Sequence, residues 1–175
     1  MKPEPGPMSD EARRLLRHTV ATLAYRAEKA LRDVPEGFAD VRLSPSSRTP
    51  LETLAHMSDL MGWGERMARG TMRWEPSPPG TWPETVDRFF AAVAALDAAL
   101  AEGPAVTLTA DVIFQGPVAD ALTHVGQLAL MRGTMAAPVR PESYARADIA
   151  VGRVGRDQSG DRYEFTGDAS KPRTT

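Results

Sequence analysis

The sequence contains no cysteine. Disulfide bonds, a cysteine nucleophile and thiolate ligands from the chain itself are therefore excluded. Any metal ion would have to bind through imidazole, carboxylate or amide groups. Histidine is scarce as well, with three in 175 residues, so each histidine can be considered separately.

Long apolar runs and an excess of one charge are also missing. No segment approaches the ~18 uninterrupted apolar residues that indicate a membrane span. The N-terminus, MKPEPGPMSDEARR, lacks the apolar stretch of a signal peptide. The chain has 21 basic and 23 acidic residues, a formal net charge of −2. We therefore expect a cytoplasmic protein with neither a membrane nor a nucleic acid as partner.

Four stretches have apolar residues at helical spacing, and no strand signal of comparable strength accompanies them. Ser9 can cap the first. Thr49 and Glu52 have the spacing of a capping box at the start of the second, with Pro50 in its first turn. Pro117 is predicted to lie in the first turn of the fourth. These signals predict an all-α fold with helices over about 9–32, 49–70, 81–103 and 116–135.

The connection between the second and third helices includes MRWEPSPPG, which is too rich in proline for a helix. Residues 72–81 could span at most ~33–36 Å. A 20-residue helix is ~30 Å long. The connection can therefore cross the whole bundle, which permits parallel second and third helices but does not require them.

We expect residues 1–138 to form the helical bundle and residues 139–175 to form an irregular C-terminal tail that packs on it. Beyond Pro138 the composition shifts to Arg, Gly and Asp with scattered apolar residues. The last part, DRYEFTGDASKPRTT, has a composition typical of disorder.

The three histidines differ in their helical surroundings. His18 lies nearly opposite the apolar stripe of its helix, together with Arg14 and Tyr25, which predicts a residue at the surface or in a subunit contact. His56 lies within an apolar stripe and is predicted to face inward. A buried histidine paired with a nearby carboxylate, Glu52 or Asp59, is the commoner arrangement for such a residue.

His124 follows Asp120 by four residues, so the two side chains project side by side from one helix face. This spacing suits a shared metal ion. It suits a simple hydrogen bond between carboxylate and imidazole equally well, and that is the more frequent case. Several methionines at helical spacing are interpreted as core filling: Met57, Met61, Met67, Met131 and Met135.

The segments Ala55-His56 and Ala119-Asp120-Ala121-Leu122-Thr123-His124-Val125-Gly126-Gln127 resemble the DinB-like (YfiT-like) superfamily. In that family a histidine on the second helix joins a His-x-x-x-His-x-Gly-Gln segment on the fourth. The resemblance covers roughly residues 9–138. It implies a four-helix bundle of up-down-down-up topology, usually a homodimer, with a divalent metal ion such as nickel or zinc.

Carried over residue by residue, the resemblance implies that His56, Asp120 and His124 are the metal ligands. Asp120 stands where most members have histidine. Two histidines and one carboxylate leave positions for water or substrate, as a catalytic site requires. Asp59 and Gln127 could orient a ligand or move a proton, although each is also explained as an ordinary polar residue at a packing edge.

Two functions follow from this interpretation. The first is a divalent-metal-dependent enzyme, such as a thiol-dependent transferase, an isomerase or a hydrolase, that acts on a small-molecule substrate. Because the chain lacks cysteine, any thiol would have to arrive as a cosubstrate. The alternative is a non-catalytic, stress-related binding or structural dimer with a weakened metal site, in which Asp120 only hydrogen-bonds His124.

Overall fold

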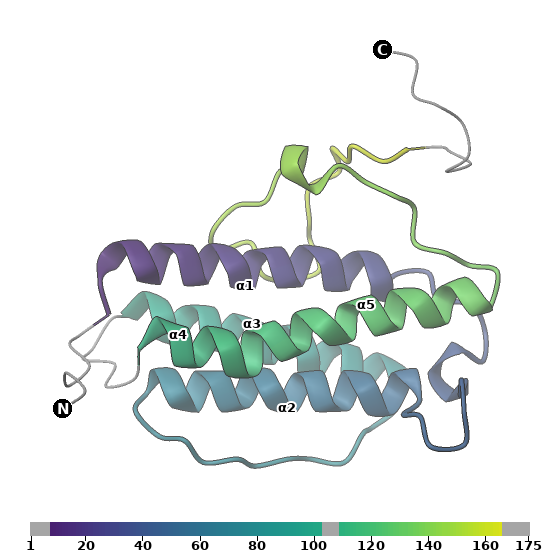
Figure 1. Ribbon diagram of the computed structural model, residues 1–175, viewed down its shortest axis with the longest axis horizontal. Helices are drawn as coiled ribbons and strands as arrows, with labels where there is room; N and C mark the ends of the chain where they lie inside the picture. Colours follow the sequence, from purple (N-terminus) through teal and green to yellow (C-terminus); the bar gives the residue numbers. More distant parts are fainter. Residues whose placement is uncertain (1–7, 103–108, 166–175) are drawn as a thin grey trace.

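The computed structural model describes residues 8–102 and 109–165. Within these ranges the protein is helical, and its extended pairing is limited to an isolated bridge between Glu142 and Glu164. The prediction of an all-α fold is therefore confirmed. Four long helices lie side by side (Figure 1), namely α1 (Asp10–Leu31), α2 (Pro50–Ala68), α3 (Trp82–Glu102) and α5 (Ala119–Thr134).

The long helices run in two directions (Figure 1). α1 and α5 run one way, and α2 and α3 run the other way. α1 and α2 each pack against both α3 and α5. The remaining short elements are η1 (Phe38–Asp40), α4 (Ala110–Ile113), η2 (Phe114–Val118) and η3 (Tyr144–Arg146). This packing places α2 and α5 next to each other and antiparallel.

Two of the predicted helix starts are confirmed at the level of single hydrogen bonds. The Ser9 hydroxyl accepts from the backbone N–H of Ala12 at 3.2 Å. The Thr49 hydroxyl accepts from the N–H of Glu52 at 3.1 Å, and the Glu52 carboxylate accepts from the N–H of Thr49 at 2.8 Å. The capping box fixes the register of α2 and hence the position of His56 on it.

The predicted start of the fourth helix is wrong. Helical structure already begins with α4 at Ala110, and Pro117 lies inside the π-helical turn η2 rather than in a first turn. Proline has no N–H for a regular α-helical bond, and a wider π turn absorbs this defect without ending the helix. The helix therefore passes through the proline and continues as α5.

Gly64 lies where α2 packs closely against its neighbours. A Cβ atom at this position would lie 3.2 Å from Cγ of Pro117 and 3.3 Å from Cδ2 of Leu96. Both contacts are tighter than an ordinary van der Waals separation. The absence of a side chain therefore lets α2 pack directly against η2 and α3, which holds α2 and the start of α5 in a fixed relation.

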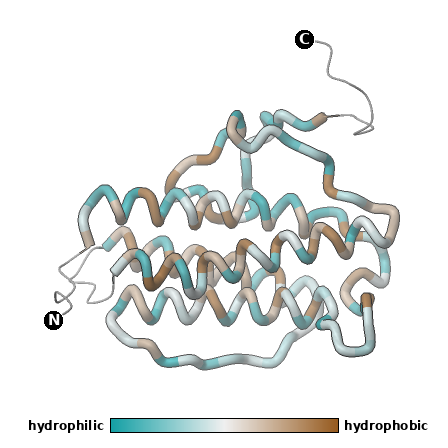
Figure 2. Tube along the Cα trace, in the orientation of Figure 1, coloured by the Kyte–Doolittle hydropathy of each residue, from teal (hydrophilic) through white to brown (hydrophobic). Residues whose placement is uncertain are grey.

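The core lies between the helices and is aliphatic and methionine-rich. Apolar residues recur along each helix, whereas the connection after α2 is mostly hydrophilic (Figure 2). Leu54, Leu96 and Leu128 are fully buried. The expected core methionines Met57, Met61, Met67 and Met131 are buried, and Met135 packs against the core. Among the described residues, no helix is long and apolar enough to cross a membrane.

Residues 70–81, which we call the strap, cross the bundle alongside α2 (Figure 1). The indole N–H of Trp63 donates to the carbonyl of Met72 at 3.2 Å, and the N–H of Ser77 donates to Oδ1 of Asp59 at 3.2 Å. Hydrogen bonds from α2 therefore hold the strap along its length. This path makes α2 and α3 parallel, one of the two arrangements that the length of the connection allowed.

The C-terminal tail covers part of the α1 face that carries His18 and Tyr25, which was expected at the surface or in a subunit contact. Tyr25 is fully buried, and its hydroxyl donates to Glu142 at 2.5 Å. Lys29, also buried, forms ion pairs with Glu142 at 2.5 Å and Glu164 at 3.0 Å. His18, on the same face of α1, is half-buried. The residues after Pro138 therefore cover this face of α1.

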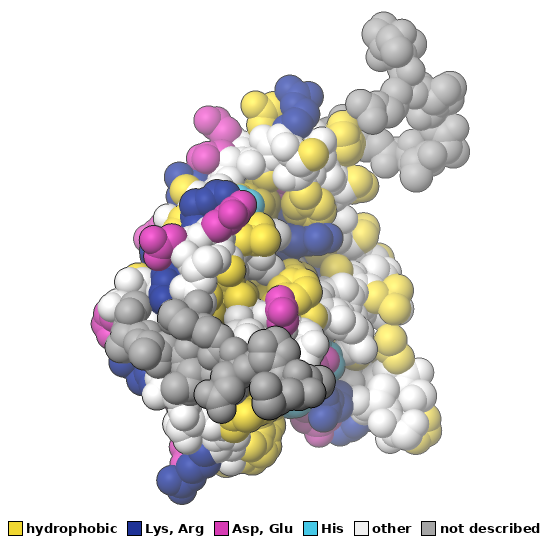
Figure 3. Space-filling view, turned by 60° about the vertical axis from the view of Figure 1, so that its left-hand side comes forward, with side chains coloured by type: hydrophobic (Ala, Val, Ile, Leu, Met, Phe, Trp, Pro, Cys, Tyr) yellow, Lys and Arg dark blue, Asp and Glu magenta, His cyan; other side chains and the backbone are white. Residues whose placement is uncertain are grey.

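Part of the stretch with a disorder-like composition is held in place. Arg162 donates to Glu28 at 2.6 Å, and Glu164 reaches Lys29. Residues 166–175 of that stretch lie outside the described residues. On the face shown in Figure 3, acidic and basic side chains are interspersed and neither sign forms a continuous patch.

Candidate metal centre

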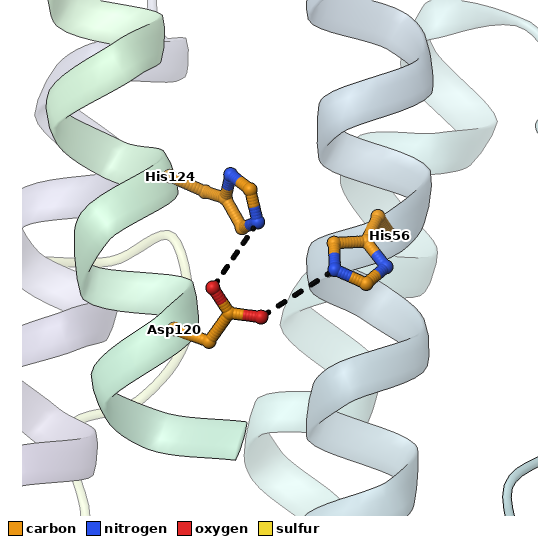
Figure 4. Close-up of side chains that lie close together, drawn as sticks. All are labelled: His56, Asp120 and His124. Atoms are coloured by element: carbon orange, nitrogen blue, oxygen red, sulfur yellow. Dashed lines mark ion pairs between the residues drawn. The ribbon is translucent and has the colours of Figure 1, made fainter. Parts of the chain in front are cut away.

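The structure brings His56, Asp120 and His124 together across the interface of α2 and α5. The Asp120 carboxylate lies between the two imidazoles (Figure 4). Its Oδ2 is 3.5 Å from Nε2 of His56, and its Oδ1 is 3.4 Å from Nε2 of His124. The ring centroids of the two histidines are 5.0 Å apart. Three potential ligands from two helices thus converge on one point.

The cluster lies at the edge of the helix interface rather than in the core. The side chain of His124 is 11% exposed, that of His56 is 22% exposed and that of Asp120 is 46% exposed. His124 is thus held by packing, whereas Asp120 remains accessible to solvent. A small molecule can therefore approach the cluster without any rearrangement of the helices.

Gln127 fixes the orientation and tautomer of His124. Nδ1 of His124 lies 2.7 Å from Oε1 of Gln127, one turn further along α5. The amide oxygen can only accept, so Nδ1 carries the proton in this arrangement. Nε2 of the neutral ring then presents a lone pair toward Asp120, which is the form that binds metal ions.

The separations are in the range expected of groups that share one cation. Typical N–H···O hydrogen bonds have donor-acceptor distances of roughly 2.7–3.2 Å, shorter than either distance from Asp120 to an imidazole. Bonds of about 2.0–2.2 Å to one tetrahedral ion would place neighbouring ligand atoms about 3.4 Å apart. One ligand atom from each residue lies within 4.8 Å of the others. The three residues can therefore hold a metal ion.

The surroundings of His56 favour its neutral form. Burial lowers the pKa of His56, and the positive charge of Arg48 and the neighbouring His124 lower it further, against the opposing effect of Asp120. A neutral imidazole can donate a lone pair to a metal ion, whereas an imidazolium cannot. Both histidines are thus arranged for ligation.

Neither local carboxylate is paired with His56, contrary to the packing interpretation. Glu52 closes the capping box and pairs with Arg42 at 2.9 Å. Asp59 accepts from Ser77 in the strap and lies 3.7 Å from Arg88. The carboxylate beside His56 comes instead from another helix. Asp59 thus anchors the strap, while Gln127 contacts His124 directly.

Trp74 of the strap covers His56, a contact that the sequence analysis did not predict. The two rings meet edge to face with centroids 5.9 Å apart, and Trp63 lies 5.7 Å from Trp74 in the same manner. The sequence signal for this contact was a tryptophan within a proline-rich connection that is long enough to cross the bundle. These rings give the centre an apolar wall on the α2 side.

Comparison of the chain with protein-family models, with curated proteins and with solved structures finds no match.

Proposed function

We propose that this protein is a divalent-metal-dependent enzyme of the DinB-like superfamily. His56, Asp120 and His124 bind the ion, with nickel or zinc as the expected metal because imidazole nitrogens suit both. The observation that carries the proposal is the convergence of the Asp120 carboxylate and two imidazole Nε2 atoms, at 3.5 Å from His56 and 3.4 Å from His124.

Helix order supports the superfamily assignment. α1 and α5 run opposite to α2 and α3, with a strap long enough to join parallel helices, which agrees with an up-down-down-up four-helix bundle (Figure 1). The ligands come from the second and fourth long helices, as in that family. The same resemblance leads us to propose a homodimer.

The chemistry follows from an incompletely filled coordination sphere. A divalent ion held by three protein ligands lowers the pKa of a water molecule or thiol that binds it. The Gln127 amide oxygen favours the ligating tautomer of His124, and Trp74 packs edge to face against His56. The arrangement suits hydrolysis, isomerisation or thiol transfer on a small molecule, with any thiol supplied as a cosubstrate.

Metal content tests the proposal. Tag-free protein prepared without chelator should hold about one tightly bound divalent ion per chain, as a site with three protein ligands predicts. His124→Ala should abolish binding. His18→Ala is the matched control, since His18 lies on α1 away from the cluster, and should leave the metal content unchanged. Absence of metal with no uptake on addition would instead support the non-catalytic binding or structural protein.

A further inference from the structure

A cavity of about 440 Å³ adjoins the candidate metal centre. It lies between the segment that precedes α2 and the second half of α5, and His124 and Gln127 form part of its wall. Small-molecule sites are typically concave spaces of about 300–1,000 Å³ with a few polar groups in apolar surroundings. The cavity has the size and the position of a substrate pocket for the centre.

The cavity contains one cationic side chain, Arg48, and no carboxylate among its described lining residues. The nearby Arg42 pairs with Glu52 and donates to the carbonyl of Ser47. By contrast, Arg48 makes no hydrogen bond or ion pair with any described residue. Its guanidinium is thus free to bind an anion, which it can do through two parallel N–H donors.

The rest of the wall is largely apolar. Leu43 and Leu130 are 46% and 63% exposed, and Met131 lies deeper between them and the core. Exposed leucines that border one concave space can pack against an apolar group that enters it. Arg48 and the apolar wall together fit a ligand with one anionic end and an apolar body.

We propose that this cavity binds a small organic anion, with its carboxylate on Arg48 and its apolar body against Leu43 and Leu130. The inference rests on the proposed function in one respect, because it takes this anion as the substrate of the metal centre. In that pose the bound anion lies beside His124, which is one of the three proposed metal ligands.

Phenylacetate and phenylacetamide are matched probes, since they differ mainly in charge. Calorimetric titration of nickel-loaded protein should show tighter binding of phenylacetate. Arg48→Gln should lower the affinity for phenylacetate about tenfold, as expected for loss of a charge-assisted contact. The affinity for phenylacetamide should not change. Arg48→Lys should restore part of the preference. Arg14→Gln removes an exposed charge from α1 and should have no effect.

A second variant places a negative charge at the rim without touching Arg48. Leu130→Glu, at an exposed helical position, should lower the affinity for phenylacetate more than the affinity for phenylacetamide. Equal affinities for the two probes, or a preference that survives Arg48→Gln, would overturn the inference.

Metal analysis of the same samples separates the two proposals. If the protein binds nickel fully but shows no preference for the anion, the anion site is contradicted and the metalloenzyme proposal is not. If the protein takes up no nickel but binds the anion through Arg48, the metalloenzyme proposal is contradicted and the anion site is not.

Discussion

Nδ1 of His124 lies 2.7 Å from Oε1 of Gln127. The contact spans one turn of α5, so the same helix that supplies two of the proposed ligands also supplies the group that orients one of them. Outer partners of this kind typically set the tautomer and the basicity of a ligating histidine.

Replacement of Gln127 should weaken metal binding without removing a ligand. In Gln127→Leu the Nδ1 proton of His124 loses its acceptor, and we expect metal affinity to fall about 10- to 100-fold. Gln127→Glu, which keeps an acceptor oxygen, should retain most of the affinity. Gln115→Leu makes the same change at an exposed position and serves as the control. Competition with a chelator measures the metal affinity of the wild type and the three variants. Equal affinities for Gln127→Leu and Gln115→Leu would contradict the orienting role.

Asp120 should be required as a ligand and not merely as a hydrogen-bond partner. Asp120→Asn keeps the shape and a hydrogen-bonding oxygen but removes the charge, so we expect affinity to fall by more than the about 100-fold that loss of an outer partner costs. Asp120→His gives the three-histidine pattern of the DinB-like superfamily proposed for this chain, and this variant should still bind the metal ion. Metal retained in full by Asp120→Asn would show that the carboxylate is not a ligand.

Trp74 should report metal binding through its fluorescence. Its ring lies 5.9 Å from that of His56, close enough for a bound paramagnetic ion to quench its emission. Addition of nickel should quench a fraction of the emission, and Trp74→Phe should remove most of that response. Trp82, which packs against Phe38, provides the control, because Trp82→Phe should leave the quenching in place. Quenching that persists in Trp74→Phe would place the ion elsewhere.

Glu142 should stabilise the fold through Lys29. Glu142→Ala leaves the buried Lys29 ammonium with Glu164 as its remaining carboxylate and removes the acceptor of the Tyr25 hydroxyl. We expect a loss of about 2–3 kcal/mol, somewhat below the roughly 3–5 kcal/mol for a fully broken buried pair. Glu102→Ala breaks an exposed pair with Arg69 and should cost at most about 1 kcal/mol. Chemical denaturation measures both, and equal losses would mean that the tail contributes little.

The tail contact of Glu164 should weaken in acid. Burial opposes ionisation of this group, but Lys29 and the nearby arginines outweigh it and hold the pKa of Glu164 below its ordinary value of 4.5. A lowered carboxyl pKa stabilises the folded state above the unfolded value, and this contribution is lost as pH falls through the folded value. The difference in Tm between wild type and Glu164→Gln should therefore be constant near neutral pH and shrink below pH 4.5. A difference that does not vary with pH would exclude this ion pair as its source.

Local signals in the sequence were sufficient for the helix class and for two of the starts. Ser9 and the Thr49 and Glu52 pair act within one turn, so their hydrogen bonds follow from spacing alone. Pro117 was misplaced because proline is favoured in a first turn, whereas here a π-helical turn accommodates it beside Gly64 of α2. Tyr25 was misplaced because the periodicity of α1 does not reveal what the distant tail covers.

The candidate metal centre was also predictable from the sequence only in part. Periodicity predicted an inward-facing His56, which the structure places half-buried at the edge of the helix interface. Periodicity also predicted that Asp120 and His124 share one face, because this relation depends only on the pitch of a helix. Only the tertiary structure decided that the carboxylate between the imidazoles comes from α5, since Glu52 and Asp59 both lie within one helical turn or so of His56 in the sequence. The covering by Trp74 and the cavity at Arg48 also arise only when α2, α5, the strap and the segment before α2 pack together. Helical periodicity relates residues within one element, whereas contacts between elements depend on packing across long separations in the chain.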